Sequence, residues 1–249
     1  YISNYKKSLE NLAQCDIKVV AYNFMPILDW VRTDHAHINV DGTKALLFDE
    51  VAFIFFDVYL LKRPGAENDY TQEQLDEAKT YGDSLDHLEK EKLFKNVLLG
   101  LPGSDESFTP EKILELLEAY KGIDDRTLRK NLIHFLSEVA PLAEELGIKL
   151  AIHPDDPPFS VLGLPRVVST EKDIADILSA VSVTANGLCY CTGSLGAWPS
   201  NDLVRIIDQH GDRIHFLHLR NVKREDGKRF RESEHLNGCL LYTSPSPRD

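Results

Sequence analysis

The sequence predicts an α/β fold, and we interpret it as part of a (β/α)8 barrel. Short apolar runs of strand length alternate with longer segments of helical period, the pattern of βαβ units with parallel strands. Three of these runs end in a polar residue, at His153, Cys191 and His218. A barrel draws its active residues from the carboxyl ends of several strands, whereas an open doubly wound sheet binds ligands at one crevice. We therefore prefer the barrel, which is incomplete because only four strands are recognisable.

Helical sequence opens the chain over residues 1–14, and the first expected strand is Ile17–Tyr22. Because a barrel chain would normally open with a strand, we expect that sequence is missing before residue 1. From Pro26 to Arg126 we expect a long helical insertion. Its charged stretch from Tyr70 to Phe94 predicts one or two surface helices with a solvated face.

Helix signals become clearer after this insertion. Thr109, Pro110 and Glu111 form a capping residue, a first-turn proline and an acid, which together predict a helix start. Apolar residues at three- and four-residue steps from Leu128 to Leu146 predict a long helix that Gly147 ends.

The strand expected next is Ile148–His153, and the following helix begins at an approximate capping box over residues 170–173. Strand Gly187–Cys191, a helix from Leu203 to His210 and strand Ile214–His218 complete the pattern. Residues 239–249, CLLYTSPSPRD, have no period and resemble translated adapter sequence. We therefore assign residues 1–238 to a partial barrel domain and 239–249 to a non-native tail.

Composition limits the classes of function. The chain has 249 residues, of which 43% are hydrophobic, and this suits one large α/β domain. Its net charge of −12 argues against nucleic acid as a partner, although a few local cations are enough to hold a small anion. Apolar runs stop well short of the ~18 residues that span a bilayer, so we expect no membrane helix. Four scattered cysteines favour the reducing cytoplasm over a disulfide framework.

Two imidazoles and a thiolate at successive strand ends make up most of a four-ligand metal site. Side chains alternate along a strand, so His215 falls on the face opposite His218, whereas Cys189 shares a face with Cys191. We choose Cys191 because it is nearer the loop. Taken alone, each cysteine or histidine is more often a buried hydrophobe or a hydrogen-bonded core residue. Their recurrence at equivalent strand ends favours metal binding.

Several strings in the sequence, taken together and in order, resemble the mannonate dehydratase family. The resemblance covers about residues 1–238. The strings are YNFMPILDWVRTD from Tyr22, IHPDDPP from Ile152, GLPRVVST from Gly163, CTGSLGA from Cys191 and HFLHLRN from His215.

This resemblance implies a xylose-isomerase-like TIM barrel that acts in glucuronate degradation, a branch of hexuronate catabolism. It implies dehydration of D-mannonate to 2-dehydro-3-deoxy-D-gluconate and water, with Mn²⁺ or Fe²⁺ as cofactor. The family's metal ligands fall on His153, Cys191 and His218, while its fourth ligand, a carboxylate in a later Asp-His-Gly string, has no match here. The residues alone do not exclude zinc. The resemblance also implies a homo-oligomer for the intact protein.

Candidate substrate residues lie near the edge of the sheet at which His153, Cys191 and His218 are expected to meet, which we call the rim. Arg166, Arg220 and Arg32 are candidates to grip the sugar-acid carboxylate, with Asn23 and Trp30 shaping the sugar pocket. Arg166 is the first choice, because it follows Leu164-Pro165 in a loop that should overhang the rim, although a surface cation is the plain alternative.

The catalytic acid and base remain unassigned, because the family's proton-transfer groups lie largely beyond residue 249. We therefore expect little or no activity from this polypeptide by itself. Two alternatives stay open. A metal-dependent sugar isomerase or epimerase on the same barrel would need further acidic ligands at strand ends. A degenerate, non-catalytic barrel would retain no metal.

Overall fold

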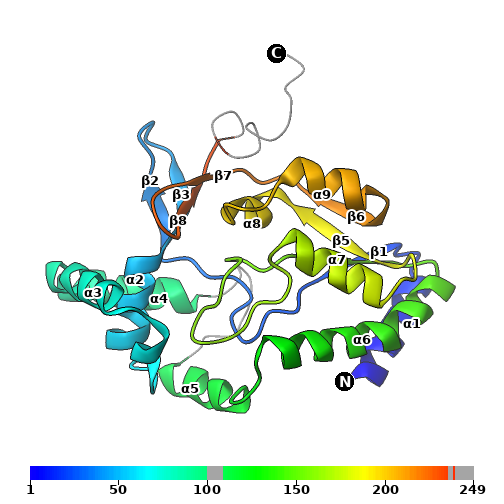
Figure 1. Cartoon of the computed structure of the whole chain (residues 1–249), viewed down its shortest axis with the longest axis horizontal. Helices are drawn as coiled ribbons and strands as arrows, with labels where there is room; N and C mark the ends of the chain where they lie inside the picture. The colour runs from blue at the N-terminus through cyan, green and yellow to red at the C-terminus, as the bar shows by residue number, and fades with distance from the viewer. Residues whose placement is uncertain (100–108, 235–237, 239–249) are drawn as a thin grey trace.

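A parallel sheet forms the centre of the computed structural model, which describes residues 1–99, 109–234 and 238 (Figure 1). Its four strands lie in the order β1-β4-β5-β6, and every neighbouring pair is parallel. The strands are β1 (Val19–Tyr22), β4 (Lys149–Ile152), β5 (Asn186–Cys191) and β6 (Ile214–His218). All four strands expected from the sequence are therefore confirmed, with differences only at their ends.

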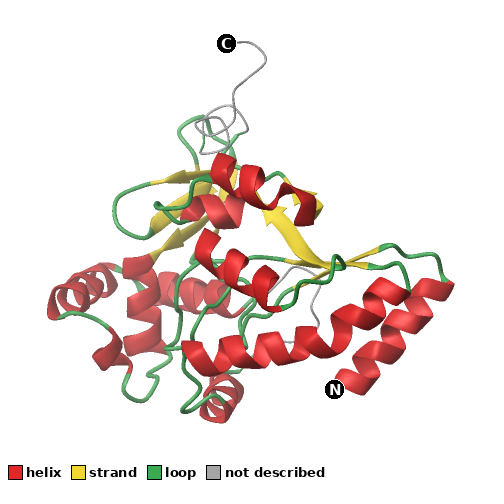
Figure 2. Ribbon diagram, turned by 45° about the vertical axis from the view of Figure 1, so that its right-hand side comes forward, coloured by secondary structure: helices red, strands yellow, loops and turns green. Residues whose placement is uncertain are grey.

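Helices cover this sheet where the apolar period predicts them. Figures 1 and 2 show the first helix lying beside the long helix α6. The covering helices are α1 (Ile2–Gln14), α6 (Asp125–Glu145), α7 (Glu171–Ala180), α8 (Thr192–Ala197) and α9 (Leu203–His210). Leu132 and Leu136 of α6 pack with Leu150 of β4 in one buried apolar core. The helices therefore bury the outer face of the parallel strands, as in βαβ units.

Local capping signals set the helix ends. Asp124 accepts a hydrogen bond from the Thr127 N–H at 2.8 Å at the start of α6, and Gly147 follows its end with φ of 68°. Thr170 and Asp173 form a complete capping box at the start of α7. Gly147 and the capping box of α7 are the helix ends that the sequence predicts, whereas the cap at Asp124 was not among its predictions.

The structure has a second, separate sheet of four strands, which the sequence did not predict. Its antiparallel order is β2-β3-β8-β7, formed by β2 (Asp34–Ile38), β3 (Lys44–Asp49), β7 (Val222–Arg224) and β8 (Arg229–Glu232). The stretch from residue 26 to 126, in which the sequence predicts a long helical insertion, therefore begins with two strands that the sequence did not predict. These strands are short and carry many polar residues, so their sequences lack the alternation that marks a strand.

The rest of the insertion is helical, and the charged stretch forms two surface helices as expected. Its elements are α2 (Glu50–Phe55), the π-helix η1 (Phe56–Leu60), η2 (Ala66–Asp69), α3 (Gln72–Ser84), α4 (His87–Leu98) and α5 (Pro110–Ala119). Phe53 and Phe56 join Phe48 of β3 in a second apolar core. The expected tail, residues 239–249, lies outside the described residues.

The parallel sheet is open at both edges within the described part of the chain. Strand β5 is buried throughout, whereas Phe216 and Leu217 of β6 are 49% and 59% exposed. The sheet is therefore an incomplete segment of a (β/α)8 barrel. Among the described residues, none of the helices has the length and apolar character required to cross a membrane.

Candidate metal centre

The carboxyl ends of three neighbouring strands bring His153, Cys191 and His218 together. In the parallel register Cys191 lies opposite His218, and His153 directly follows Ile152, whose partner on β5 is Leu188. One ligand atom from each of the three side chains lies within 4.8 Å of the other two. His153 Nε2 is 3.3 Å from His218 Nδ1. The convergence expected from the strand ends is thus present in the structure.

The backbone fixes the ring of His153. Its Nδ1 lies 2.7 Å from the carbonyl oxygen of Pro154. Since a carbonyl oxygen can only accept, Nδ1 carries the proton and donates it. In the neutral imidazole this leaves the lone pair on Nε2, which faces the cluster. By contrast, His215 Nε2 lies 2.8 Å from the carbonyl oxygen of Thr184, away from the cluster.

The two cysteines of β5 differ in their electrostatic surroundings. Burial raises the pKa of the Cys189 thiol to about 12. Burial would also raise the pKa of Cys191, but hydrogen bonds with His153 and His218 and the charge of Arg220 bring it well below its usual 9.0. Of the two cysteines, Cys191 is therefore the one whose surroundings favour the thiolate. Burial would lower the pKa of the His153 imidazole, but the hydrogen bond and charge of Cys191 raise it overall. A thiolate with two imidazoles is a donor set that fits a divalent cation.

A buried ionic group adjoins this cluster. Asp156, 1% exposed, accepts from Arg32 Nη1 at 2.8 Å and from Arg32 Nη2 at 3.1 Å. Its Oδ2 also accepts from Arg220 Nη2 at 2.5 Å and from Ser194 Oγ at 3.2 Å. Burial would raise the Asp156 pKa, but the charges of Arg220 and Arg32 hold it far below 3.8. Asp156 was not among the site residues predicted from the sequence. The available signal was a pair of adjacent acids, Asp155 and Asp156, directly after a strand end.

Arg220 and Asn23 lie at the same rim as the cluster. Arg220 is two residues past His218, and its side chain is 16% exposed. Asn23 is exposed and directly follows β1, the strand that pairs with β4. Asn23 is therefore exposed beside the strand ends, with its Nδ2 donating to Asp29 Oδ2 at 3.4 Å, whereas Arg220 is mostly buried and bound to Asp156.

Arg32 and Trp30 are both buried. Arg32 is fully buried, and both of its Nη atoms donate to Asp156. Trp30 is 7% exposed, with Arg32 Cζ 4.8 Å from its ring centroid. These positions do not support the direct substrate contacts expected from the sequence. They indicate instead that both residues stabilise the group around Asp156.

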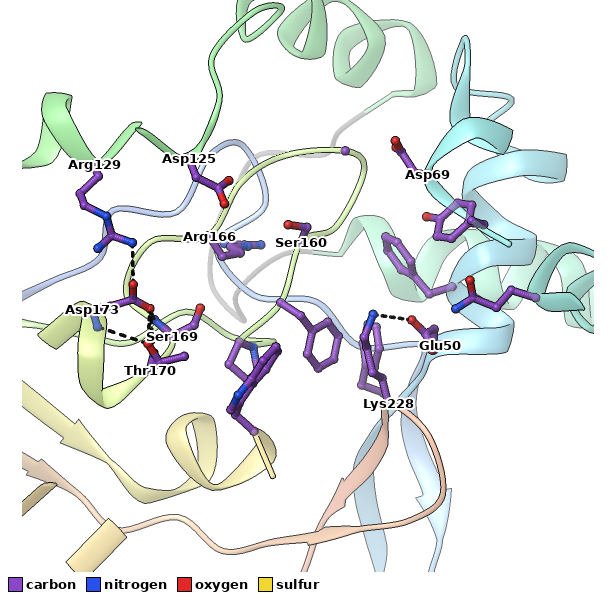
Figure 3. A pocket seen from close by; sticks show the side chains of 18 residues that line it. Glu50, Asp69, Asp125, Arg129, Ser160, Arg166, Ser169, Thr170, Asp173 and Lys228 are labelled. Carbon is purple, nitrogen blue, oxygen red and sulfur yellow. Dashed lines mark hydrogen bonds and ion pairs between the residues drawn. The ribbon is translucent and has the colours of Figure 1, made fainter. Parts of the chain in front are cut away.

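Arg166 lies in a separate pocket of about 640 Å³, shown in Figure 3 with the ion pairs Arg129–Asp173 and Lys228–Glu50 on its walls. Its Nη2 donates to the Leu28 carbonyl at 2.7 Å, whereas Nε and Nη1 have no partner. The described lining of this pocket includes none of the three cluster residues. The structure therefore does not bring Arg166 into the cluster.

The sequence matches the family model for D-mannonate dehydratase (UxuA) over residues 1–240. The chain belongs to the D-mannonate dehydratase family. It is 49% identical over 239 residues to the mannonate dehydratase of Marinomonas sp. (strain MWYL1), and 50% identical over 239 residues to that of Chromohalobacter salexigens. These alignments cover 96% of this chain and 61% of each relative. The chain thus spans about three-fifths of the length of these mannonate dehydratases.

A solved mannonate dehydratase has a similar fold. The crystal structure from Streptococcus suis serotype 2 matches with a TM-score of 0.67 and 30% identity, covering 95% of this chain and 54% of that one. Membership of the mannonate dehydratase family, suggested by five sequence strings, is confirmed. It disfavours the alternative of a sugar isomerase or epimerase.

Proposed function

We propose that the full-length protein catalyses the dehydration of D-mannonate to 2-dehydro-3-deoxy-D-gluconate and water, using Mn²⁺ or Fe²⁺, whereas this polypeptide alone has little or no activity. The convergence of His153, Cys191 and His218, in a chain of the mannonate dehydratase family, carries the proposal. The reaction belongs to glucuronate degradation, and we place it in the cytoplasm. A homo-oligomer is the proposed state of the intact protein, by similarity to the family.

The three cluster residues are the proposed metal ligands. His153 binds through Nε2, because its Nδ1 is engaged by the Pro154 carbonyl. Cys191 binds as a thiolate, the form favoured by its lowered pKa. When bound, the metal supplies a Lewis acid that stabilises negative charge developing next to the substrate carboxylate. The chain's own contribution is to hold two imidazoles and one thiolate at a common point before the cation arrives.

We propose that Arg220 binds the substrate carboxylate, because it is a partly exposed cation beside Cys191. Asn23 would hydrogen-bond the sugar hydroxyls from the neighbouring strand end. Arg166 remains a second candidate for an anionic group, since two of its guanidinium nitrogens have no partner. Arg32 and Trp30 contribute indirectly, through Asp156. We assign no general acid or base among the described residues.

The test is a dehydration assay on the full-length protein, stripped of metal and reconstituted with Mn²⁺ or Fe²⁺, with D-mannonate and several other sugar acids. His153→Ala and Cys191→Ala should each abolish turnover. Cys189→Ala is the matched control and should retain it, because Cys189 lies on the same strand outside the cluster. A full-length protein that retains no Mn or Fe and is indifferent to chelator would instead be a non-catalytic barrel.

A further inference from the structure

A second side chain near each of the three strand ends belongs to one buried hydrogen-bonded group around Asp156. Asp156 follows His153 by three residues, Ser194 follows Cys191 by three, and Arg220 follows His218 by two. Ser194 and Arg220 both donate to Asp156 Oδ2, and Arg220 Nη2 is also 3.2 Å from Ser194 Oγ. Two loops and the start of helix α8 are therefore tied together directly beside the three proposed ligands.

The chain makes room for this arrangement at Gly193. A Cβ placed there would lie 2.1 Å from Arg220 Nε, so a larger residue would push the guanidinium away. Gly193 therefore lets Arg220 pass close over the backbone of α8 and reach Asp156. The fully buried Arg32 donates to both carboxylate oxygens of Asp156. The carboxylate cannot turn away from Arg220 without breaking this bidentate pair.

We propose that Asp156 is a positioning residue that holds together the loops after β4 and β6 and the start of helix α8, and so keeps His153, Cys191 and His218 within reach of one cation. The inference rests on the metal centre of the proposed function. Asp156 acts through Ser194 and Arg220, without touching the cation. Polar partners around a metal site commonly set ligand orientation in this way, and their loss weakens metal binding.

The competing explanation is a purely structural role, in which Asp156 stabilises the fold and nothing more. The chain offers a matched control for that role. Asp57 is also fully buried, accepts two hydrogen bonds from Arg63 at 2.8 Å, and accepts a third from the Tyr70 hydroxyl at 2.7 Å. It belongs to the helical insertion and has no link to the cluster loops among its described contacts.

The experiment measures the affinity of the metal-free full-length protein for Mn²⁺ and for Co²⁺, whose thiolate charge-transfer absorption reports the bond to Cys191. Asp156→Asn should weaken metal binding by about 10- to 100-fold and shift the Co²⁺ spectrum. Ser194→Ala should weaken it less, because Arg32 and Arg220 still hold the carboxylate. Asp57→Asn should leave the affinity and the spectrum unchanged, although it also removes a buried charge.

Wild-type metal affinity in folded Asp156→Asn and Ser194→Ala would overturn the inference. If Asp156→Asn does not fold, Ser194→Ala decides, because it leaves no buried charge unpaired. An equal loss of affinity in Asp57→Asn would also overturn it, since the effect would then follow from general destabilisation. These measurements need no sugar acid. Selective loss in the Asp156 variants together with no dehydration of D-mannonate would remove the proposed function and leave this inference in place.

Discussion

Asp156 and Asp57 are two buried carboxylates that bind similar partners, but the partners of Asp156 are much farther away in the sequence. Asp57 binds Arg63 and Tyr70, which are 6 and 13 residues away. Asp156 binds Arg32, Arg220 and Ser194, which are 124, 64 and 38 residues away. The Asp57 group therefore stabilises one local segment, whereas the Asp156 group joins the insertion to the segments that follow β4, β5 and β6. Hydrogen bonds between a buried aspartate and arginine therefore stabilise one local segment at Asp57, whereas at Asp156 they connect segments far apart in the sequence.

The largest expected difference between the two groups is in stability. Asp156→Ala leaves Arg32, which is fully buried, without its carboxylate, and should lower the free energy of unfolding by about 3–5 kcal/mol. Asp57→Ala should cost less, about 2 kcal/mol. The reason is that Arg63 retains Asp69 at 2.6 Å. Urea unfolding of both variants checks this order, and equal losses would contradict it.

The next prediction contrasts the two cysteines of β5. Cys191→Ala should weaken metal binding by at least about 100-fold, because it removes a thiolate ligand. Cys189→Ala should leave metal affinity close to that of the wild type, since this thiol stays protonated in the fold. Isothermal titration with Mn²⁺ checks both variants. If Cys189→Ala lost as much affinity as Cys191→Ala, the choice of Cys191 as ligand would be wrong.

The pH dependence of stability should report the ionic group around Asp156. The folded-state pKa of Asp156 lies below its unfolded value of 3.8, so its contribution is fully present well above pH 3.8 and is lost as the pH falls below that value. Asp156→Asn should therefore lose stability less steeply than the wild type below about pH 4. Unfolding curves at several acidic pH values test this. Asp57→Asn is the control, and it should keep the acid-dependent loss that Asp156 causes.

The smallest expected effects come from the two hydroxyls that donate to these carboxylates. Ser194→Ala and Tyr70→Phe each remove one hydrogen bond to a buried aspartate, and each should lower the free energy of unfolding by about 1 kcal/mol. Thermal unfolding should give similar shifts for both variants. A much larger shift for Ser194→Ala would show that this hydroxyl does more for the fold than one hydrogen bond explains.

Local sequence determined most of the parallel sheet and its helices. Apolar runs predicted the four strands, and Thr109, Thr170 and Gly147 predicted helix ends, because caps and periodicity act within a few residues. The proposed ligands were found by the same local logic. Each lies where an apolar run meets a loop, and parallel strands place such positions at one edge.

Tertiary structure alone decided the second sheet and the Asp156 group. Leu47 of β3 pairs with Arg231 of β8, and neither strand shows a clear alternation of its own. Arg32 is a charged residue whose complete burial depends on a carboxylate 124 residues away. A local pattern carries no information about such a partner, because the free energy of burying a charge depends on which opposite charge the fold brings beside it. The three proposed ligands could therefore be predicted from the sequence, whereas the buried group of Asp156, Arg32, Arg220 and Ser194 beside them became visible only in the fold.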